Sequence, residues 1–205
     1  TVFGSYKLGP GLFIYDRGIV SGRNLKDLKC LHWDTLCGVP LNPALKKFWR
    51  PWADPQQLMQ LPNRQRVGQT VFYTCLRSYQ LGGVRGHLAL AFNERLQRDA
   101  RESRRDEVLY AQELLAQDKS IKPGLKRFFD PRGRLLPTQL ARVEEFDSYS
   151  CIFCTRSLPQ DKMLSLYFNK DLVEKAFRSL KGITQLRPVR HWLAERVHAH
   201  VFICY

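Results

Sequence analysis

The segment from Tyr167 to Ile183 constrains the fold more than any other part of the sequence, because its residues separate onto two faces of a helix. The separation follows from a turn of about 100° per residue. The apolar face comprises Leu172, Val173, Ala176, Leu180 and Ile183, with Phe177 on its flank. The polar face comprises Tyr167, Lys170, Glu174, Arg178 and Lys181. The pattern predicts a helix that packs on a core through one side and presents one carboxylate among cations on the other.

The polar face has two interpretations. As a solvated surface, it would hold Lys170–Glu174 and Glu174–Arg178 ion pairs at i,i+4, each worth roughly 0.2–0.5 kcal/mol. Runs of charge usually are solvated surfaces. As part of a site, the same face would combine one acid with several cations suited to phosphate groups. The rest of the sequence has to decide between these two interpretations.

The net charge of the chain points to a polyanionic partner. Its 205 residues include 33 Lys+Arg against 19 Asp+Glu, which gives a net charge of +14. Such an excess favours nucleic acid, and a membrane surface is the competing partner. The sequence contains neither an apolar run of about 18 residues nor a secretory signal pattern, so we expect no membrane partner and a cytoplasmic location. The chain starts without Met and ends inside an apolar run, and we expect it to be part of a longer protein.

A second acid follows a short apolar run near the start of the chain. Leu12–Tyr15 comes after Gly9-Pro10-Gly11 and predicts a buried strand, which ends in Asp16-Arg17-Gly18. An acid at the carboxyl end of a buried strand is a common way to project a carboxylate into a site. The alternative is a turn aspartate that caps the next segment.

Strand and helix patterns mix along the chain and predict an α/β fold. The expected strands are Leu12–Tyr15, Leu36–Val39, Thr70–Leu76, His87–Phe92 and Ser148–Thr155. Helices are expected around Leu25–Leu31, from Asn42 to Trp49, from Glu94 to about Gln117, from Gln139 to Phe146 and after Pro159. The long helix balances its own charge, so we expect it to be solvated. The segment Pro55–Asn63 is expected to be irregular.

Asp16 and Glu174 together suggest phosphoryl-transfer chemistry. A carboxylate at a strand end and another on a later helix are the hard oxygen ligands that a pair of Mg²⁺ ions needs. Cations beside Glu174 would hold the phosphates of bound DNA. We therefore expect the two carboxylates to approach within about 4–8 Å, close enough to share a metal pair.

The spacing on this helix resembles a known signature. Tyr167-x2-Lys170-x3-Glu174-x6-Lys181 resembles the Y-x2-R-x3-E-x6-K signature of DDE transposases of bacterial insertion sequences, with every gap preserved. The departure is Lys170, where the family usually has Arg; Lys keeps the charge but loses the planar fork that makes bidentate phosphate contacts.

Further segments resemble the same family and extend the resemblance over nearly the whole chain. Phe13–Gly18 resembles its second-acid strand. Phe146–Tyr149 resembles its F-D-G-Y lead into a late core strand, with Ser148 in place of Gly. Arg187–Trp192 and Ala199–Ile203 resemble its closing helix.

The resemblance implies an RNase H-like core, a mixed sheet flanked by helices, with an α+β insertion before the Glu-bearing helix. Residues 1–40 would belong to this core, residues 41–140 to the insertion and residues 141–205 to the remainder of the core. Asp16 and Glu174 would be the second Asp and the Glu of the catalytic triad and would bind Mg²⁺, or Mn²⁺ in its place. The first Asp is expected upstream of Thr1.

The resemblance also implies a reaction and partners. The family cleaves double-stranded DNA at transposon ends by attack of water, and the freed 3′ hydroxyl then attacks target DNA. Such an enzyme would act as a homodimer in a synaptic complex, in the cytoplasm at the nucleoid. Tyr167, Lys170 and Lys181 would hold the end DNA near the metal ions. Charge and position extend this DNA-binding set to Arg178, Arg187, Arg190 and His191.

Two other functions compete with the enzyme. A decayed, catalytically inactive remnant of a transposable element would still fold and bind DNA without cutting it. A basic structural protein that binds RNA would keep its function when Glu174 is changed to Ala. An acidic residue that ends an apolar strand upstream of Thr1 would support the enzyme.

Overall fold

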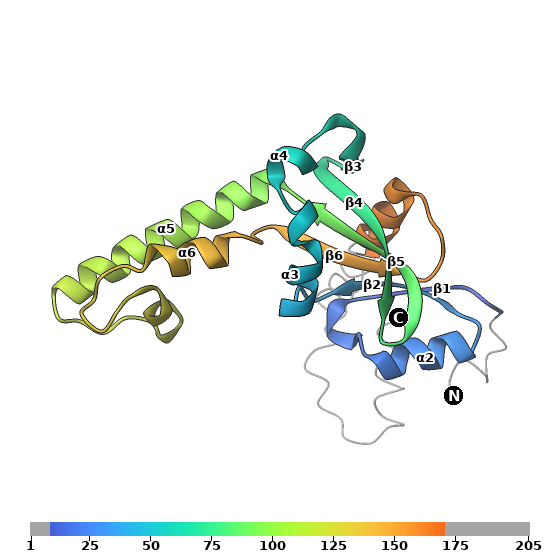
Figure 1. Ribbon diagram of the computed structural model, residues 1–205, viewed down its shortest axis with the longest axis horizontal. Helices are drawn as coiled ribbons and strands as arrows, with labels where there is room; N and C mark the ends of the chain where they lie inside the picture. The colour runs from blue at the N-terminus through green and yellow to red at the C-terminus, as the bar shows by residue number, and fades with distance from the viewer. Residues whose placement is uncertain (1–8, 171–205) are drawn as a thin grey trace, which may run out of the picture.

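The computed structural model describes residues 9–170, which form a curled, mixed six-stranded sheet with helices on both faces (Figure 1). This confirms the expected α/β class. The strands are β1 (Leu12–Tyr15), β2 (Asp34–Val39), β3 (Arg64–Val67), β4 (Thr70–Leu81), β5 (Val84–Phe92) and β6 (Tyr149–Cys154). Their order is β1-β2-β6-β5-β4-β3; β1 and β2 are parallel, and every other neighbouring pair is antiparallel.

A β-α-β unit opens the described chain. Between the parallel strands β1 and β2 lie the short η1 (Arg17–Ile19) and the helix α2 (Gly22–Cys30). The Ser21 hydroxyl caps α2 by accepting a hydrogen bond from the Asn24 amide at 3.0 Å, and Leu25 and Leu28 are buried against the sheet. Because the strands are parallel, their carboxyl ends meet at one edge of the sheet, where Asp16 follows β1.

Strand alternation divides the sheet into two cores. In β6, Cys151 and Phe153 face the cluster that α2 and α3 (Pro43–Trp49) cover. Ile152 and Cys154 face the other cluster, which the helix over residues 160–170 covers. The Cys151 and Cys154 thiols of β6 therefore lie on opposite faces of the sheet.

The β4–β5 hairpin turns through Gly82 and Gly83, both at positive φ (56° and 85°), which suits a tight two-residue turn. A Cβ on Gly82 would lie 2.5 Å from the Cα of Gly22, so the hairpin tip approaches the start of α2 backbone to backbone. The segment expected to be irregular instead contains α4 (Pro55–Leu58) and η3 (Leu61–Asn63), after η2 (Arg50–Trp52). Strand β3 follows and was not predicted.

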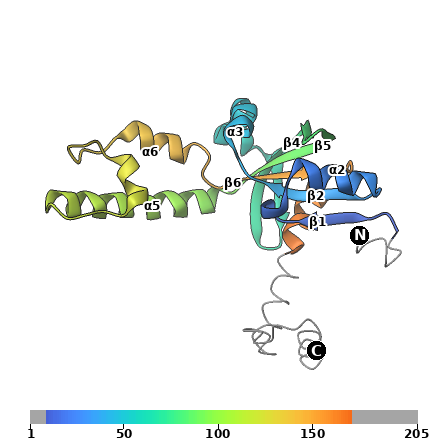
Figure 2. The same ribbon diagram turned by 90° about the horizontal axis from the view of Figure 1, so that it is seen from below.

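Residues 94–145, called the arm below, project from one end of the sheet (Figures 1 and 2). The arm contains α5 (Glu94–Ala116), η4 (Pro123–Phe128) and α6 (Pro137–Glu144), and it has a core of its own that includes Val108, Ala111 and Phe128. Strands β3–β5, which belong to the predicted insertion, continue the sheet of β1, β2 and β6. Between residues 9 and 170, no helix has the length and apolar character to cross a membrane.

The segment Phe146–Tyr149 joins the arm to the sheet. Phe146 and Tyr149 pack together with ring centroids 5.6 Å apart. Asp147 accepts two hydrogen bonds from the Arg104 guanidinium of α5. Ser148 adopts a φ of 61°, in the left-handed region that favours glycine. The glycine of the resembled F-D-G-Y pattern would therefore suit this backbone better than the serine that stands here.

Ser148→Gly is expected to stabilise the protein by about 0.5–1 kcal/mol, because glycine removes the cost of a left-handed Cβ, offset in part by its greater unfolded-state entropy. Urea unfolding measures the change. The control is Ser103→Gly inside α5, where the same replacement should destabilise by roughly 0.5 kcal/mol. A loss of stability at both positions would contradict the prediction.

Candidate active site

The Asp16 side chain lies at the carboxyl end of β1 and is 55% exposed. Its Oδ1 accepts a hydrogen bond from the Arg17 amide at 2.7 Å and caps η1. The turn-cap interpretation of Asp16 is therefore correct, and it does not exclude a site, because the carboxylate still faces an open pocket.

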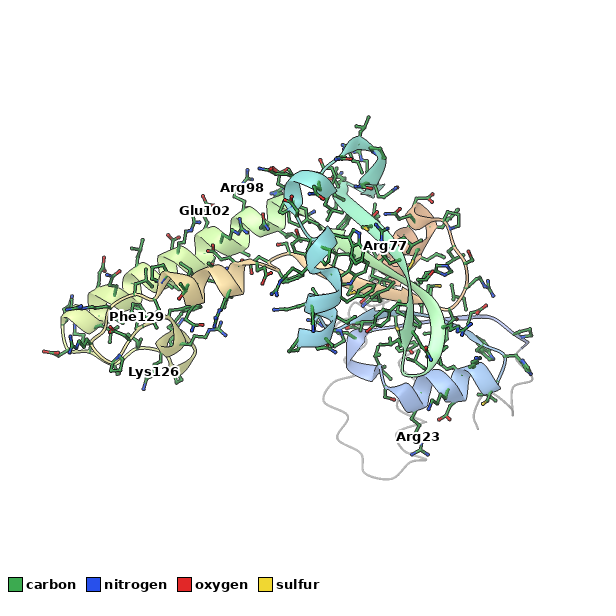
Figure 3. The ribbon with its side chains drawn as sticks, viewed as in Figure 1. Arg23, Arg77, Arg98, Glu102, Lys126 and Phe129 are labelled. Atoms are coloured by element: carbon green, nitrogen blue, oxygen red, sulfur yellow. The ribbon has the colours of Figure 1, made fainter. Side chains whose placement is uncertain are left out.

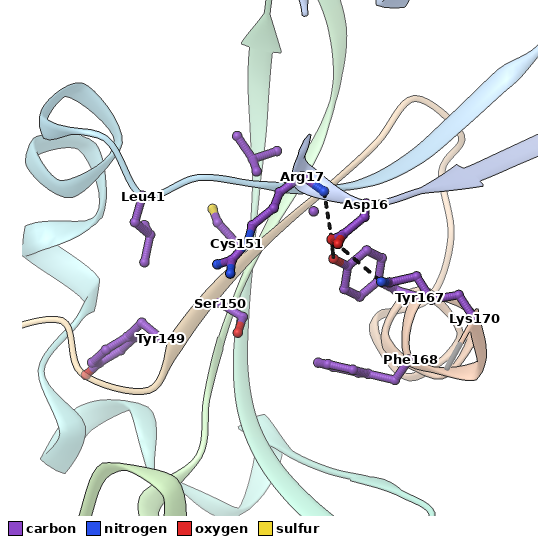
Figure 4. A pocket seen from close by; sticks show the side chains of 11 residues that line it. Asp16, Arg17, Leu41, Tyr149, Ser150, Cys151, Tyr167, Phe168 and Lys170 are labelled. Atoms are coloured by element: carbon purple, nitrogen blue, oxygen red, sulfur yellow. Dashed lines mark hydrogen bonds and ion pairs between the residues drawn. The ribbon is translucent and has the colours of Figure 1, made fainter. Parts of the chain in front are cut away.

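Tyr167 and Lys170 lie against Asp16, from the helix over residues 160–170 on the other face of the sheet (Figure 4). The Tyr167 hydroxyl is 3.2 Å from Asp16 Oδ1 across 151 positions of sequence, and Lys170 Nζ is 3.6 Å from the same atom. Tyr167 is 8% exposed, and the Lys170 side chain is 18% exposed. For these two residues the solvated-surface interpretation is wrong.

Three contacts thus converge on one oxygen of Asp16. The Arg17 amide, the Lys170 charge and the Tyr167 hydroxyl together hold the pKa of the Asp16 carboxyl below its ordinary value, although partial burial acts in the opposite direction. The carboxylate is therefore ionised at neutral pH. A depressed folded-state pKa contributes stability above the unfolded-state pKa, and this contribution is lost as the pH falls through the folded-state value. Burial, followed by the charge of Asp16, raises the pKa of Tyr167, so its hydroxyl is a neutral donor.

Lys170→Gln is expected to raise the pKa of Asp16 toward its ordinary value, because a favourable charge is removed while the Arg17 hydrogen bond stays. Titration of the Asp16 carboxyl carbon by NMR measures the shift. The matched control is Lys162→Gln, an exposed lysine on the same helix, which should leave the Asp16 pKa unchanged. An unchanged pKa in both variants would show that Lys170 does not act on this carboxylate.

A pocket of about 280 Å³ opens beside Asp16. Its walls come from η1, from β2 and the residues after it, from the start of β6 and from the helix over residues 160–170. Figure 4 shows Arg17 reaching across the pocket toward Ser150 and Cys151. One carboxylate, one guanidinium and one ammonium therefore line the same opening, an arrangement that could hold a phosphate group next to a cation site.

Gly38 of β2 makes room for Tyr167. A Cβ at this position would clash with the Tyr167 hydroxyl and would lie 2.9 Å from its ring Cζ. The tyrosine therefore packs over a position of β2 that has no side chain. A glycine inside a buried strand often marks such a close approach, and this signal was available in Leu36–Val39.

The Cys151 thiol also lines the pocket, but it is not a candidate nucleophile. Burial raises the pKa of Cys151 to about 12, although the Trp49 indole N–H donates to its sulfur at 3.1 Å. At neutral pH the thiol is therefore protonated, and the thiolate is the nucleophilic form.

The described part of the pocket supplies one ligand suited to Mg²⁺. The ionised, half-exposed carboxylate of Asp16 is a hard oxygen donor that fits such a cation. Residues 9–170 contain no group of three or more His, Cys, Asp or Glu placed to hold a metal ion. The remaining predicted site residues, namely Glu174, Arg178, Lys181, Arg187, Arg190 and His191, lie outside the described residues. The expected separation of Asp16 and Glu174 therefore stays a prediction.

Sequence reasoning found Asp16, Tyr167 and Lys170, which the structure brings together, and missed Arg17 and Gly38. Arg17 stands next to the acid in the predicted turn, and its basic character was the available signal. The contributions of Ser150 and Cys151 depend on the pairing of β6 with β2, which no local pattern specifies.

Comparisons with protein-family models, with curated proteins and with solved structures give no match to this chain.

Proposed function

We propose that this chain contributes to the catalytic core of a DDE transposase, an RNase H-like nuclease that cleaves DNA with Mg²⁺ or Mn²⁺ and joins the new end to target DNA. One observation carries the proposal. Tyr167 and Lys170, identified by their spacing from Glu174, lie against Asp16, identified independently from its place after a strand. Two unrelated sequence signals therefore meet at one pocket.

The RNase H-like arrangement is supported by two features. A parallel β-α-β unit places an acid at the carboxyl end of its first strand. The helix that carries Tyr167 packs on the opposite sheet face from α2. From there the Tyr167 hydroxyl donates a hydrogen bond to that acid, Asp16. The charged pocket at this edge suits the backbone of a nucleic acid more than an apolar ligand.

The residues have distinct roles in this proposal. Asp16 is a metal ligand together with Glu174, and the bound ions would activate the attacking hydroxyl and stabilise the leaving oxygen. Tyr167 fixes the carboxylate by donating to Oδ1. Lys170 and Arg17 attract the scissile phosphate and hold it by charge-assisted hydrogen bonds. The Lys170 ammonium acts as a point charge, and the planar Arg17 guanidinium can donate two parallel hydrogen bonds. Lys181, Arg178, Arg187, Arg190 and His191 would extend this DNA contact.

The test is Mg²⁺-dependent nicking of duplex DNA by the full-length native protein and by two carboxylate-to-amide variants of it, Asp16→Asn and Glu174→Gln. Nicking should be lost in both variants, while DNA binding, measured by fluorescence anisotropy, should be largely kept. Binding without nicking in the unchanged protein would favour an inactive DNA-binding remnant. Loss of binding together with nicking in Glu174→Gln would indicate a structural role for Glu174.

A further inference from the structure

The excess positive charge of the described chain is carried by the sheet rather than by the arm. Residues 94–145 contain twelve basic and ten acidic residues. Residues 9–93 and 146–170 contain fourteen basic residues against six acidic ones. Long-range attraction would therefore bring a polyanion to the sheet and its covering helices.

A second pocket, of about 270 Å³, lies where α2, the start of β2, the start of β5 and the end of β6 meet. Leu25 and Val84 contribute buried apolar side chains to it, 1% and 3% exposed. Lys29 of α2, His32 of the turn after it and Arg85 of β5 are exposed and contribute basic groups. The cluster therefore depends on the tertiary fold and does not belong to one helix.

The basic groups at this pocket are not neutralised by the acid beside them. Asp34 also lines the pocket, but its carboxylate accepts hydrogen bonds from Thr155 Oγ1 at 3.0 Å and from Arg156 Nε at 2.7 Å. Within residues 9–170, neither Lys29 nor Arg85 forms an ion pair. As far as the described residues go, two full positive charges therefore stay available to a ligand.

This pocket is distinct from the one at Asp16. The amide of Asp34 pairs with the carbonyl of Gly11 at the amino-terminal end of the β1–β2 pair, whereas Asp16 follows the carboxyl end. In the β1–β2 register Asp16 follows the pair Tyr15–Cys37 and is level with Gly38, four residues beyond Asp34, so at about 3.3 Å per residue roughly 13 Å of strand separates the two places. One phosphate group cannot occupy both places.

The surface around the pocket is held by backbone contacts. The hairpin tip at Gly82 lies directly against Gly22 of α2. The Lys26 side chain passes beside Gly83, since a Cβ there would lie 3.2 Å from Lys26 Cε. Figure 3 shows Arg23 on the same helix pointing away from the molecule. The basic groups are thus presented on a fixed platform rather than on a free loop.

We infer that Lys26, Lys29, His32 and Arg85, called the α2 surface, form a second binding surface for the phosphate backbone of duplex DNA. Charge complementarity carries the inference, and the identification of the polyanion as DNA rests on the proposed function. The surface takes phosphates at a place remote from the one at Asp16, so it supplies affinity and orientation rather than chemistry. Contacts of this kind are insensitive to base sequence.

The experiment measures the salt dependence of duplex binding by the native protein, by fluorescence anisotropy with a labelled DNA duplex in EDTA. Lys29→Gln/Arg85→Gln should lower the slope of log K against log [salt] by about 1.8, because each lost phosphate contact removes about 0.9. The affinity should fall roughly ten- to thirty-fold at 0.15 M salt. The matched control is Lys119→Gln/Arg132→Gln, the same charge change at exposed positions of the arm. It should leave the slope unchanged.

An equal change in both pairs would overturn the inference, because it would show a general charge effect. An unchanged slope in Lys29→Gln/Arg85→Gln, with lost binding to phosphatidylserine vesicles instead, would overturn it in favour of a membrane partner. Nicking by the native protein, measured alongside, separates the two proposals. If the slope falls in the Gln pair while the native protein shows no nicking, the α2 surface stands and the catalytic proposal fails. If nicking is present and the slope is unchanged, the α2 surface alone fails.

Discussion

Asp16→Asn is expected to lower Mg²⁺-dependent nicking of duplex DNA by about three orders of magnitude or more, with DNA affinity within a few-fold of the native value. Asn keeps the size of the side chain and can still accept the Arg17 amide hydrogen bond that caps η1. It loses the negative charge that a hard cation requires. Loss of metal-supplied charge stabilisation is worth several kcal/mol, and each 1.36 kcal/mol is about tenfold in rate.

The control for this prediction is Asp161→Asn, the same change at an exposed acid on the helix that carries Lys170. It should leave nicking within about a factor of two. Thermal unfolding of both variants separates a lost fold from lost chemistry. Native-like nicking by a folded Asp16→Asn protein would remove Asp16 from the catalytic set.

Gly38→Ala is expected to destabilise the protein by about 1–3 kcal/mol, the range for an overpacked core. The added methyl group collides with the Tyr167 ring, which is packed between the sheet and the helix that carries it. The neighbouring Phe168 stacks on Phe72 of the sheet, with ring centroids 4.7 Å apart, and so holds this helix in place. Either the helix moves or the Tyr167–Asp16 contact breaks, so nicking should fall as well. Urea unfolding measures the stability change.

Two comparisons test the cause. Gly124→Ala, where no atom lies within 4 Å of the added Cβ, should change stability by less than about 0.5 kcal/mol. In a Tyr167→Ala background the cost of Gly38→Ala should largely disappear, because the colliding ring is gone; a double-mutant cycle measures this coupling. Full additivity of the two changes would mean that Gly38 is required for another reason.

Local chemistry predicted much of the fold. The apolar run Leu12–Tyr15 is β1 at the bounds expected from the sequence, and Asn42-Pro43 starts α3 through the Asn42 cap. Strand β3 was missed because its residues, Arg64–Val67, are mostly polar and lie at the sheet edge, where only pairing with β4 makes them a strand. Short-range signals do not record such pairing.

The site divides in the same way. The sequence identified Asp16 from its place after an apolar run, and Tyr167 and Lys170 from their spacing to Glu174. Both patterns are visible within short stretches of the chain. Their meeting depends on how the helix over residues 160–170 packs over Gly38, which is a property of the tertiary structure. The sequence alone could not choose between the two interpretations of the polar face, and the structure decides only for Tyr167 and Lys170, through their burial.

The attachment of the arm has a consequence for how chains of this kind vary. β5 and β6 are antiparallel neighbours whose pairing begins at Phe92 and Tyr149, so residues 93–148 occupy the place of an ordinary hairpin loop. The pairing of β5 with β6 requires only that some segment connects Phe92 to Tyr149. The arm packs around a hydrophobic core of its own, separate from the cores of the sheet. Insertions and deletions in the arm would then leave the strand register, and with it the edge that carries Asp16, unchanged. The arm is a segment whose length evolution can alter separately from the chemistry at the sheet.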